Sequence, residues 1–185
     1  MVMDHWQALL ELDLRLCRQL RLSPTAWRGW RWLAAFLAHS GDSWFWLAGL
    51  GIVWLVGSPA WRYRAAAMAI GTVFLAALVL AIKFSIRRRR PDGEWGAIYR
   101  NTDPHSFPSG HAARSVFLAV MAWSLGPPWF AWVLTLWAPL LSLCRVAMGV
   151  HYLSDLLGGI PVGALTGLLT LLALPLVVSL VPFLF

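Results

Sequence analysis

The sequence predicts an all-α protein, a polytopic bundle of membrane helices, and three observations support this prediction. Hydrophobic residues make up 59% of the 185 residues and charged residues only 12%, whereas about a quarter of a soluble domain is charged. Four long segments contain no charged residue: 43–61, 65–82, 115–144 and 156–185. A helix needs about 20 such residues to cross a hydrocarbon core. Thirteen tryptophans are typical of chains anchored at membrane interfaces.

We expect about six transmembrane helices and an N-terminal amphipathic helix that lies at the interface. Residues 1–22 supply the amphipathic helix, because Leu9, Leu16 and Leu20 share one stripe with charged residues between them. Ser23 and Pro24 offer an N-cap and a first-turn proline for a short tryptophan-rich helix over 25–39 that crosses the bilayer only in part. The remaining expected spans are 43–58, 62–84, 109–125, 128–148 and 152–180.

The order of the spans predicts which loops meet. Successive spans alternate in direction, so the polar loop 85–108 and the region 145–151 must lie on the same side. The turns at 57–61 and 126–128 lie on the other side. The expected layout puts seven arginines on the side of the N-terminus, including Arg62 and Arg64, and seven basic residues on the opposite side, so the raw count is a tie. If the loop arginines bind phosphate, the other seven decide and favour a cytoplasmic N-terminus by the positive-inside rule. The polar loop would then face outward.

The chain carries a net charge of +7, with 15 basic residues of which Lys83 is the only lysine. In a soluble chain this balance would suggest nucleic acid, but no nucleic-acid-binding motif is visible. We therefore expect the lipid bilayer and a lipid phosphate as partners, and no nucleic acid. The two cysteines do not form a disulfide framework.

Three polar clusters interrupt the apolar chain. They are KFSIRRRRP, with Lys83 and Arg90; PSGH, with Ser109, Gly110 and His111; and CRVAMGVHYLSD, with Arg145, His151 and Asp155. Each cluster alone has a plain structural explanation. A polybasic run beside a membrane binds headgroups, Pro-Ser-Gly forms a turn and a helix cap, and a histidine four residues before an aspartate makes a hydrogen bond.

Together the clusters indicate chemistry, because so many cationic groups at one membrane face repel one another unless an anion joins them. Arginine offers a planar fork and lysine a point charge to phosphate oxygens. Gly110 lets a helix start approach an anion closely. The i, i+4 spacing of His151 and Asp155 lets the carboxylate fix the imidazole tautomer. His111 is then available as a general acid. The clusters predict phosphoryl transfer through a covalent phosphohistidine, with no metal and no cofactor.

The pattern K-x6-R-P, P-S-G-H and R-x5-H-x3-D resembles that of the type 2 phosphatidic acid phosphatase (PAP2) family, which includes bacterial lipid phosphatases. The motifs cover 83–155, and the helix layout extends the resemblance over most of a single domain, 1–185. The resemblance implies that His151 attacks phosphorus, that Asp155 orients it, and that His111 protonates the leaving oxygen and then activates water. The residues implied to hold the phosphate are Lys83, Arg90, Ser109, Gly110 and Arg145. The implied location is the bacterial cytoplasmic membrane, with the site at its outer face.

Some residues near the motifs remain unassigned by this reasoning. Cys144 stands where the family has serine, and a thiol is the weaker hydrogen-bond donor, so some support for the phosphate is expected to be lost. Arg87, Arg88 and Arg89 are either solvated or contact a headgroup or second phosphate. We expect Arg114 to pair with an acid or to face the site. The remaining expectations are that Asp92, Glu94 and Asp103 form salt bridges and that His105 is a bystander.

Two other functions remain open, a lipid phosphotransferase that uses the same site and a non-catalytic lipid-phosphate binding or transport protein. The sequence does not choose among undecaprenyl diphosphate, phosphatidylglycerol phosphate, phosphatidic acid and phosphorylated lipid A. A short polar loop and an arginine run favour a prenyl diphosphate or a glycerophospholipid phosphate. The sequence does not indicate an oligomeric state.

Overall fold

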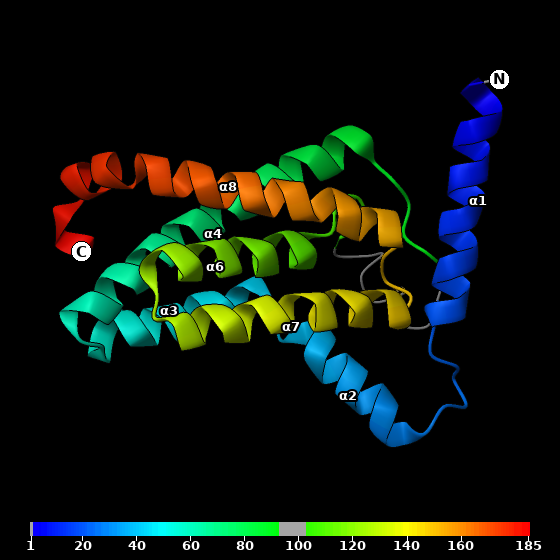
Figure 1. Ribbon diagram of the computed structural model, residues 1–185, viewed down its shortest axis with the longest axis horizontal. Coiled ribbons are helices and arrows are strands. Elements are labelled where there is room, and N and C mark those ends of the chain that lie inside the picture. The colour runs from blue at the N-terminus through cyan, green and yellow to red at the C-terminus, as the bar shows by residue number, and fades with distance from the viewer. Residues whose placement is uncertain (1, 93–102) are drawn as a thin grey trace.

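The computed structural model describes residues 2–92 and 103–185, and every named element within them is a helix (Figure 1). The α-helices are α1 (Val2–Leu20), α2 (Arg28–His39), α3 (Ser43–Val56), α4 (Pro59–Ile86), α6 (Gly110–Leu125), α7 (Pro128–Ala147) and α8 (Leu153–Leu180), and a short 3-10 helix covers Pro182–Leu184. The predicted all-α membrane bundle is confirmed, and most helix boundaries lie within a few residues of the expected ones.

Helices α3, α4, α6, α7 and α8 run alongside one another and form the bundle, with α6 packed against α4, α7 and α8 (Figure 1). Phe117 and Leu118 of α6 are fully buried in the core that these helices share. Glycines on α8 allow the close approach to α6. A Cβ atom added at Gly163 would lie 2.0 Å from the carbonyl oxygen of Ala113, so any larger residue there would force the two helices apart.

Three helices of the described chain, α4, α7 and α8, are long and apolar enough to cross a membrane. The expected count of six included residues 25–39, but α2 begins and ends near the same end of the bundle. Leu22, just before it, donates a backbone hydrogen bond to Ala147 at 2.9 Å, and Gly41, just after it, accepts one from Arg114. A helix of 12 residues is also only about 18 Å long at 1.5 Å per residue. Helix α2 therefore does not cross between the two ends.

The start of α2 differs from the expectation as well. Ser23 does not cap the helix, because its hydroxyl accepts from the backbone N–H of Thr25 at 3.1 Å and forms a local turn. The helix begins at Arg28, after Trp27. By contrast, α7 begins at Pro128 as expected, and α4 begins at Pro59, inside the expected turn and three residues before the expected start at 62.

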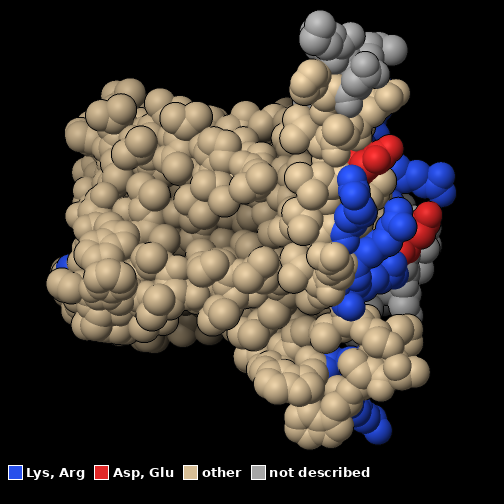
Figure 2. All heavy atoms as spheres, turned by 45° about the vertical axis from the view of Figure 1, so that its right-hand side comes forward, with Lys and Arg blue, Asp and Glu red and all other residues tan. Residues whose placement is uncertain are grey.

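Helix α1 runs across one end of the bundle (Figure 1), as expected for an interfacial amphipathic helix, and it lies at the end that also holds Arg88 and Asp155. Figure 2 shows most of the visible Lys and Arg side chains gathered at this end. The expected grouping of Arg15, Arg18 and Arg21 with Arg62 and Arg64 is therefore wrong, since the last two lie at the far end, where Arg64 binds the carbonyl of Leu125. The arginine count no longer supports an outward-facing site.

Candidate functional site

The three polar clusters of the sequence meet at the end of the bundle that α1 crosses. The end of α4 and the segment after it supply Lys83 and Arg90, the start of α6 supplies Ser109 and His111, and the α7–α8 connection supplies Arg145, His151 and Asp155. Arg90 contacts the backbone carbonyl of Val150 at 2.9 Å, and Ser109 N donates to the carbonyl of Asp155 at 2.9 Å. The expected meeting of the polar loop with residues 145–151 is confirmed. Residues 93–102 of that loop, with Glu94, lie outside the described residues.

His151 and Asp155 form a buried pair. Nδ1 of His151 lies 3.3 Å from Oδ2 of Asp155, and the two side chains are 1% and 0% exposed. Oδ2 also accepts from the backbone N–H of Tyr152 at 2.9 Å, which fixes the carboxylate at the first turn of α8. Gly149 has a φ of 67°, a conformation that glycine adopts without strain, and this turn brings His151 back over the helix start.

The electrostatic surroundings of His151 favour its neutral form. Burial lowers the pKa of His151 well below 6.5, and the positive charges of Arg90, Arg145 and Lys83 lower it further. With Asp155 beside Nδ1, the proton of the neutral ring belongs on that nitrogen. Nε2 then carries a lone pair, and Arg90 Nη1 lies 3.2 Å from it. The ring is prepared to act as a nucleophile through Nε2.

The basic residues next to His151 are buried and already hold an anionic group. Lys83 and Arg90 are 4% and 2% exposed. The carboxylate of Asp103 bridges them, in contact with Lys83 Nζ and 2.7 Å from Arg90 Nη2. Burial lowers the pKa of Arg90, while Asp103 acts in the opposite direction. The pair therefore accommodates an oxyanion, and the expected salt-bridge role of Asp103 is confirmed.

The PSGH turn opens α6 as expected. Ser109 is the N-cap residue, and its hydroxyl accepts from the backbone N–H of Ala112 at 3.4 Å. Arg145 is fully buried near the end of α7, with Nη1 3.5 Å from the carbonyl of Ala38. Cys144 packs beside an apolar cluster that includes Ala38 and Val150. The 39–42 turn contacts both helices, since a Cβ atom added at Gly41 would meet His111 of α6 and Leu141 of α7.

Asp42 is a site residue that the sequence reasoning missed. Its Oδ1 lies 2.7 Å from Nε2 of His111, and both side chains are largely buried. Burial acts to raise the pKa of Asp42, but the hydrogen bond with His111 and the positive charges of His111 and its neighbours lower it. Arg114 holds the same turn by donating to the carbonyl of Gly41. The only signal in the sequence was an aspartate in the turn before an apolar helix, which also suits an ordinary cap.

If His111 is the general acid expected from the sequence, replacing Asp42 by asparagine should weaken this acid rather than abolish catalysis. The amide keeps a hydrogen-bonding group beside His111 but removes the negative charge that stabilises its protonated form. We expect kcat for a lipid phosphate to fall by about 10- to 100-fold, part of the roughly 10²- to 10⁴-fold that a general acid contributes. A substrate with a nitrophenolate leaving group, which needs little protonation, should lose much less. Equal losses with both substrates would contradict this role.

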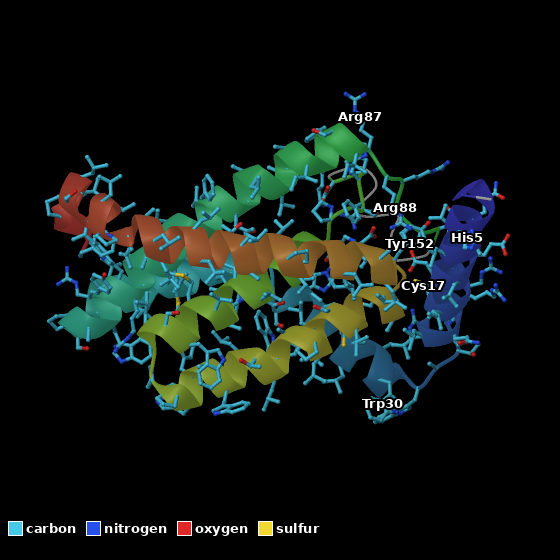
Figure 3. The ribbon with its side chains drawn as sticks, turned by 45° about the horizontal axis from the view of Figure 1, so that its top comes forward. His5, Cys17, Trp30, Arg87, Arg88 and Tyr152 are labelled. Atoms are coloured by element: carbon cyan, nitrogen blue, oxygen red, sulfur yellow. The ribbon has the colours of Figure 1, made fainter. Side chains whose placement is uncertain are left out.

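Arg88 is the second residue that the sequence left unassigned. It donates to Asp155 Oδ1 at 2.7 Å and to Asp13 of α1 at 3.0 Å, and its guanidinium lies 4.1 Å from the Tyr152 ring centre. Figure 3 shows Arg88 beside Tyr152 and facing α1, whereas Arg87 points away. Arg88 therefore holds the carboxylate that faces His151 and joins it to α1.

The selection of Arg88 from four consecutive arginines has a simple geometric cause. Arg87 ends α4 in the left-handed conformation, with a φ of 54°, and the chain then turns extended, with Arg89 forming an isolated bridge to His105. Side chains alternate along an extended segment. Arg88 and Arg90 therefore face the site, and Arg89 is exposed.

Comparison with known proteins places these residues in a family context. The model of the PAP2 superfamily matches residues 63–178. The decaprenylphosphoryl-5-phosphoribose phosphatase of Mycobacterium tuberculosis is 33% identical over 136 residues, which cover 71% of this chain and 73% of that protein. The protein of the same description from Mycolicibacterium smegmatis is 36% identical, over 74% of this chain and 72% of that one. A PAP2-type phosphatidylglycerolphosphate phosphatase from Bacillus subtilis has a similar structure, with a TM-score of 0.71, 25% identity, and coverage of 88% of this chain and 84% of that one.

Proposed function

Because the chain belongs to the PAP2 superfamily and is a bacterial membrane lipid phosphatase of that type, we propose that it hydrolyses its substrate through a phosphohistidine at His151. The observation that carries this proposal is the buried His151–Asp155 pair. Nε2 of His151 points away from Asp155 toward Arg90, and the charges of Arg90, Arg145 and Lys83 act on the ring. The buried cations attract an anionic phosphate, and the neutral imidazole keeps a nitrogen lone pair that can attack it.

The first step forms a bond between His151 Nε2 and phosphorus and breaks the bond from phosphorus to the lipid oxygen. Asp155 stabilises the positive charge that develops on the imidazole. This step takes His111 in its protonated form, with Asp42 Oδ1 2.7 Å from its Nε2, and His111 gives a proton to the departing lipid oxygen. Lys83, Arg90 and Arg145, with Ser109 and Gly110 at the helix start, hold the phosphoryl oxygens.

In the second step a water molecule attacks the phosphorus and the bond from phosphorus to Nε2 breaks. His111, which lost its proton in the first step, takes a proton from this water. The products are inorganic phosphate and the dephosphorylated lipid, and both histidines return to their starting states. The chain's own residues complete this cycle, and EDTA should leave the rate unchanged.

We propose a phosphate monoester at the end of a membrane lipid as the substrate class. The named relatives act on a prenylphosphoryl pentose phosphate and on a glycerophospholipid phosphate, and both substrates join such a monoester to a lipid. The fully buried floor of the site and its position beside the interfacial helix α1 suit a terminal phosphate that reaches in from the membrane surface.

The intermediate gives a direct test. The protein in detergent is mixed with a ³²P-labelled lipid phosphate and quenched after a few milliseconds. We expect label on the protein that is stable in alkali and lost in acid, as for a phosphoramidate, and free phosphate as the final product. Label recovered mainly on a second lipid would instead indicate a phosphotransferase. Binding without any turnover would indicate a capture protein.

The orientation in the membrane needs its own experiment. The family resemblance implies an outward-facing site in the cytoplasmic membrane, whereas the arginines gathered at the site end favour the cytoplasm by the positive-inside rule. A single cysteine introduced at exposed Arg89, in a variant with Cys17 and Cys144 replaced by serine, reports the side. Labelling of intact cells by a membrane-impermeant maleimide places the site outside, and labelling only after lysis places it inside.

A further inference from the structure

Helix α1 is held against the site by specific contacts. Asp13 accepts from the backbone N–H of Ser154 at 3.2 Å and pairs with Arg88. Cys17 Sγ accepts from the backbone N–H of Leu153 at 3.2 Å, and Leu22 N donates to the carbonyl of Ala147 at 2.9 Å. The last two turns of α1 therefore have a fixed position over the α7–α8 connection, which carries His151.

This position makes α1 one wall of the cavity beside the nucleophile. A cavity of about 190 Å³ is lined by His151 and Tyr152 on one side and by Leu14, Cys17, Arg18 and Arg21 of the α1 segment on the other. The guanidinium of Arg21 packs on Gly149, where an added Cβ atom would lie 3.0 Å from Arg21 Nε. Burial raises the pKa of the Cys17 thiol to about 11, so this thiol stays protonated and does not compete as a nucleophile.

Arg18 and Arg21 also line a second, adjoining cavity of about 360 Å³, with Arg31 of α2 on its far side. The two arginines therefore stand between the cavity of the nucleophile and a larger basic cavity that opens beyond it. Asp92 also lines the first cavity. It contributes one negative charge against the two positive charges of Arg18 and Arg21, so the wall formed by α1 remains cationic.

We propose that Arg18 and Arg21 form a subsite for a second anionic group in the substrate headgroup, such as a phosphodiester. This inference rests on the proposed function, because it takes the terminal phosphate to lie at His151. The fork of an arginine matches the two free oxygens of a phosphodiester. The cavity that Arg18 and Arg21 line also borders His151, so a headgroup with its terminal phosphate at His151 has its second anionic group within reach of these arginines. The favoured substrates are lipids that carry a phosphodiester as well as a terminal phosphate monoester.

The test compares two lipids that differ in this second group. Phosphatidylglycerol phosphate carries a phosphodiester and a monoester, whereas phosphatidic acid carries the monoester alone. In neutral detergent micelles, the double variant R18Q/R21Q should lose about tenfold or more in kcat/KM for phosphatidylglycerol phosphate, as expected for the loss of charge-assisted hydrogen bonds. Its kcat/KM for phosphatidic acid, which has no second anionic group to place at the subsite, should change by less than about twofold, the size of effect expected from the loss of solvent-exposed charges.

A matched control removes the same charge from the same face. Arg15 and Arg28 are exposed and line neither cavity, so R15Q/R28Q should leave the ratio of the two kcat/KM values unchanged. Equal losses with both substrates in R18Q/R21Q, or no loss with phosphatidylglycerol phosphate, would overturn the subsite. The same comparison is repeated with phosphatidylglycerol added to the micelles. If the difference in kcat/KM between R18Q/R21Q and the unmutated protein then disappears, the arginines bind bulk anionic lipid instead of the substrate headgroup.

A binding measurement separates this inference from the proposed function. Short-chain forms of both lipids are titrated into a His151→Asn variant, with and without R18Q/R21Q, and binding is followed by tryptophan fluorescence. A selective loss of affinity for the lipid with the phosphodiester supports the subsite even if the unmutated protein releases no phosphate. Equal affinities before and after the substitutions overturn it.

Discussion

Replacing His151 by asparagine should reduce phosphate release by roughly 10⁴-fold or more, the scale of loss when a covalent nucleophile is removed. Asparagine keeps a side-chain group that can face Asp155, but its amide nitrogen has no lone pair available to attack phosphorus. The acid-labile label on the protein should disappear together with the activity. The measurement is initial-rate release of inorganic phosphate from a lipid phosphate in detergent.

The matched control is His105→Asn. His105 lies in the same polar loop, but its ring packs edge-on against Phe84, with the ring centres 5.4 Å apart, and it makes no contact with the nucleophile among the described residues. This variant should keep most of the activity. If His151→Asn keeps activity within tenfold of the unmutated protein, or if the label persists on it, His151 is not the nucleophile.

Replacing Asp155 by asparagine should lower kcat by about 10³- to 10⁴-fold, the scale seen when the orienting carboxylate of a histidine is neutralised. Oδ2 of Asp155 accepts from the backbone N–H of Tyr152 and faces His151 Nδ1, and Oδ1 accepts from Arg88. An amide offers only one acceptor oxygen for these donors. If its carbonyl takes the place of Oδ2, its NH₂ group faces the donor of Arg88. If its NH₂ group takes the place of Oδ2 instead, it faces the N–H of Tyr152 and donates to Nδ1 of His151, which holds the imidazole in the wrong tautomer.

Asp13→Asn provides the control for this variant, because Asp13 shares Arg88 with Asp155 but does not touch His151. We expect it to loosen α1 and to lower kcat by less than tenfold. Both variants should keep the helical far-ultraviolet circular dichroism of the unmutated protein. A loss of the same size in both would show that Asp155 acts through the packing of α1, and a fully active Asp155→Asn would remove it from the mechanism.

The sequence predicted most helices of the bundle because their boundaries depend on local chemistry. Uncharged runs and Gly-Pro breaks fix α4, α6, α7 and α8 to within a few residues. It placed the start of α2 too early, because Ser23 uses its hydroxyl in a turn with Thr25 instead. It also put the arginines of α1 on the wrong side. The alternation of spans does not fix the side of a helix that lies at the interface, and the side of α1 is set by contacts such as Asp13 with Arg88.

The sequence predicted those site residues that belong to a motif. It did not predict residues whose role depends on a contact with a distant part of the chain. The three motifs and their resemblance to the PAP2 family single out Lys83, Arg90, Ser109, Arg145, His151 and Asp155, and the structure brings these residues to one end. Asp42 did not follow, because its contact with His111 joins residues 69 positions apart. The sequence alone could not distinguish Arg88 from the other arginines of the run 87–90. Only the left-handed turn at Arg87 determines which side chains of the run face the site.

By itself, the sequence determined that this protein is a membrane bundle with a phosphate site, because hydropathy and short motifs are local properties of the chain. The tertiary structure alone decided which charges neutralise one another and on which side each lies. It placed Asp42 beside His111, Arg88 beside Asp155, and Arg18 with Arg21 over the cavity of His151. These pairings depend on how helices pack, since burial of a charge is tolerated only where folding brings it an opposite partner.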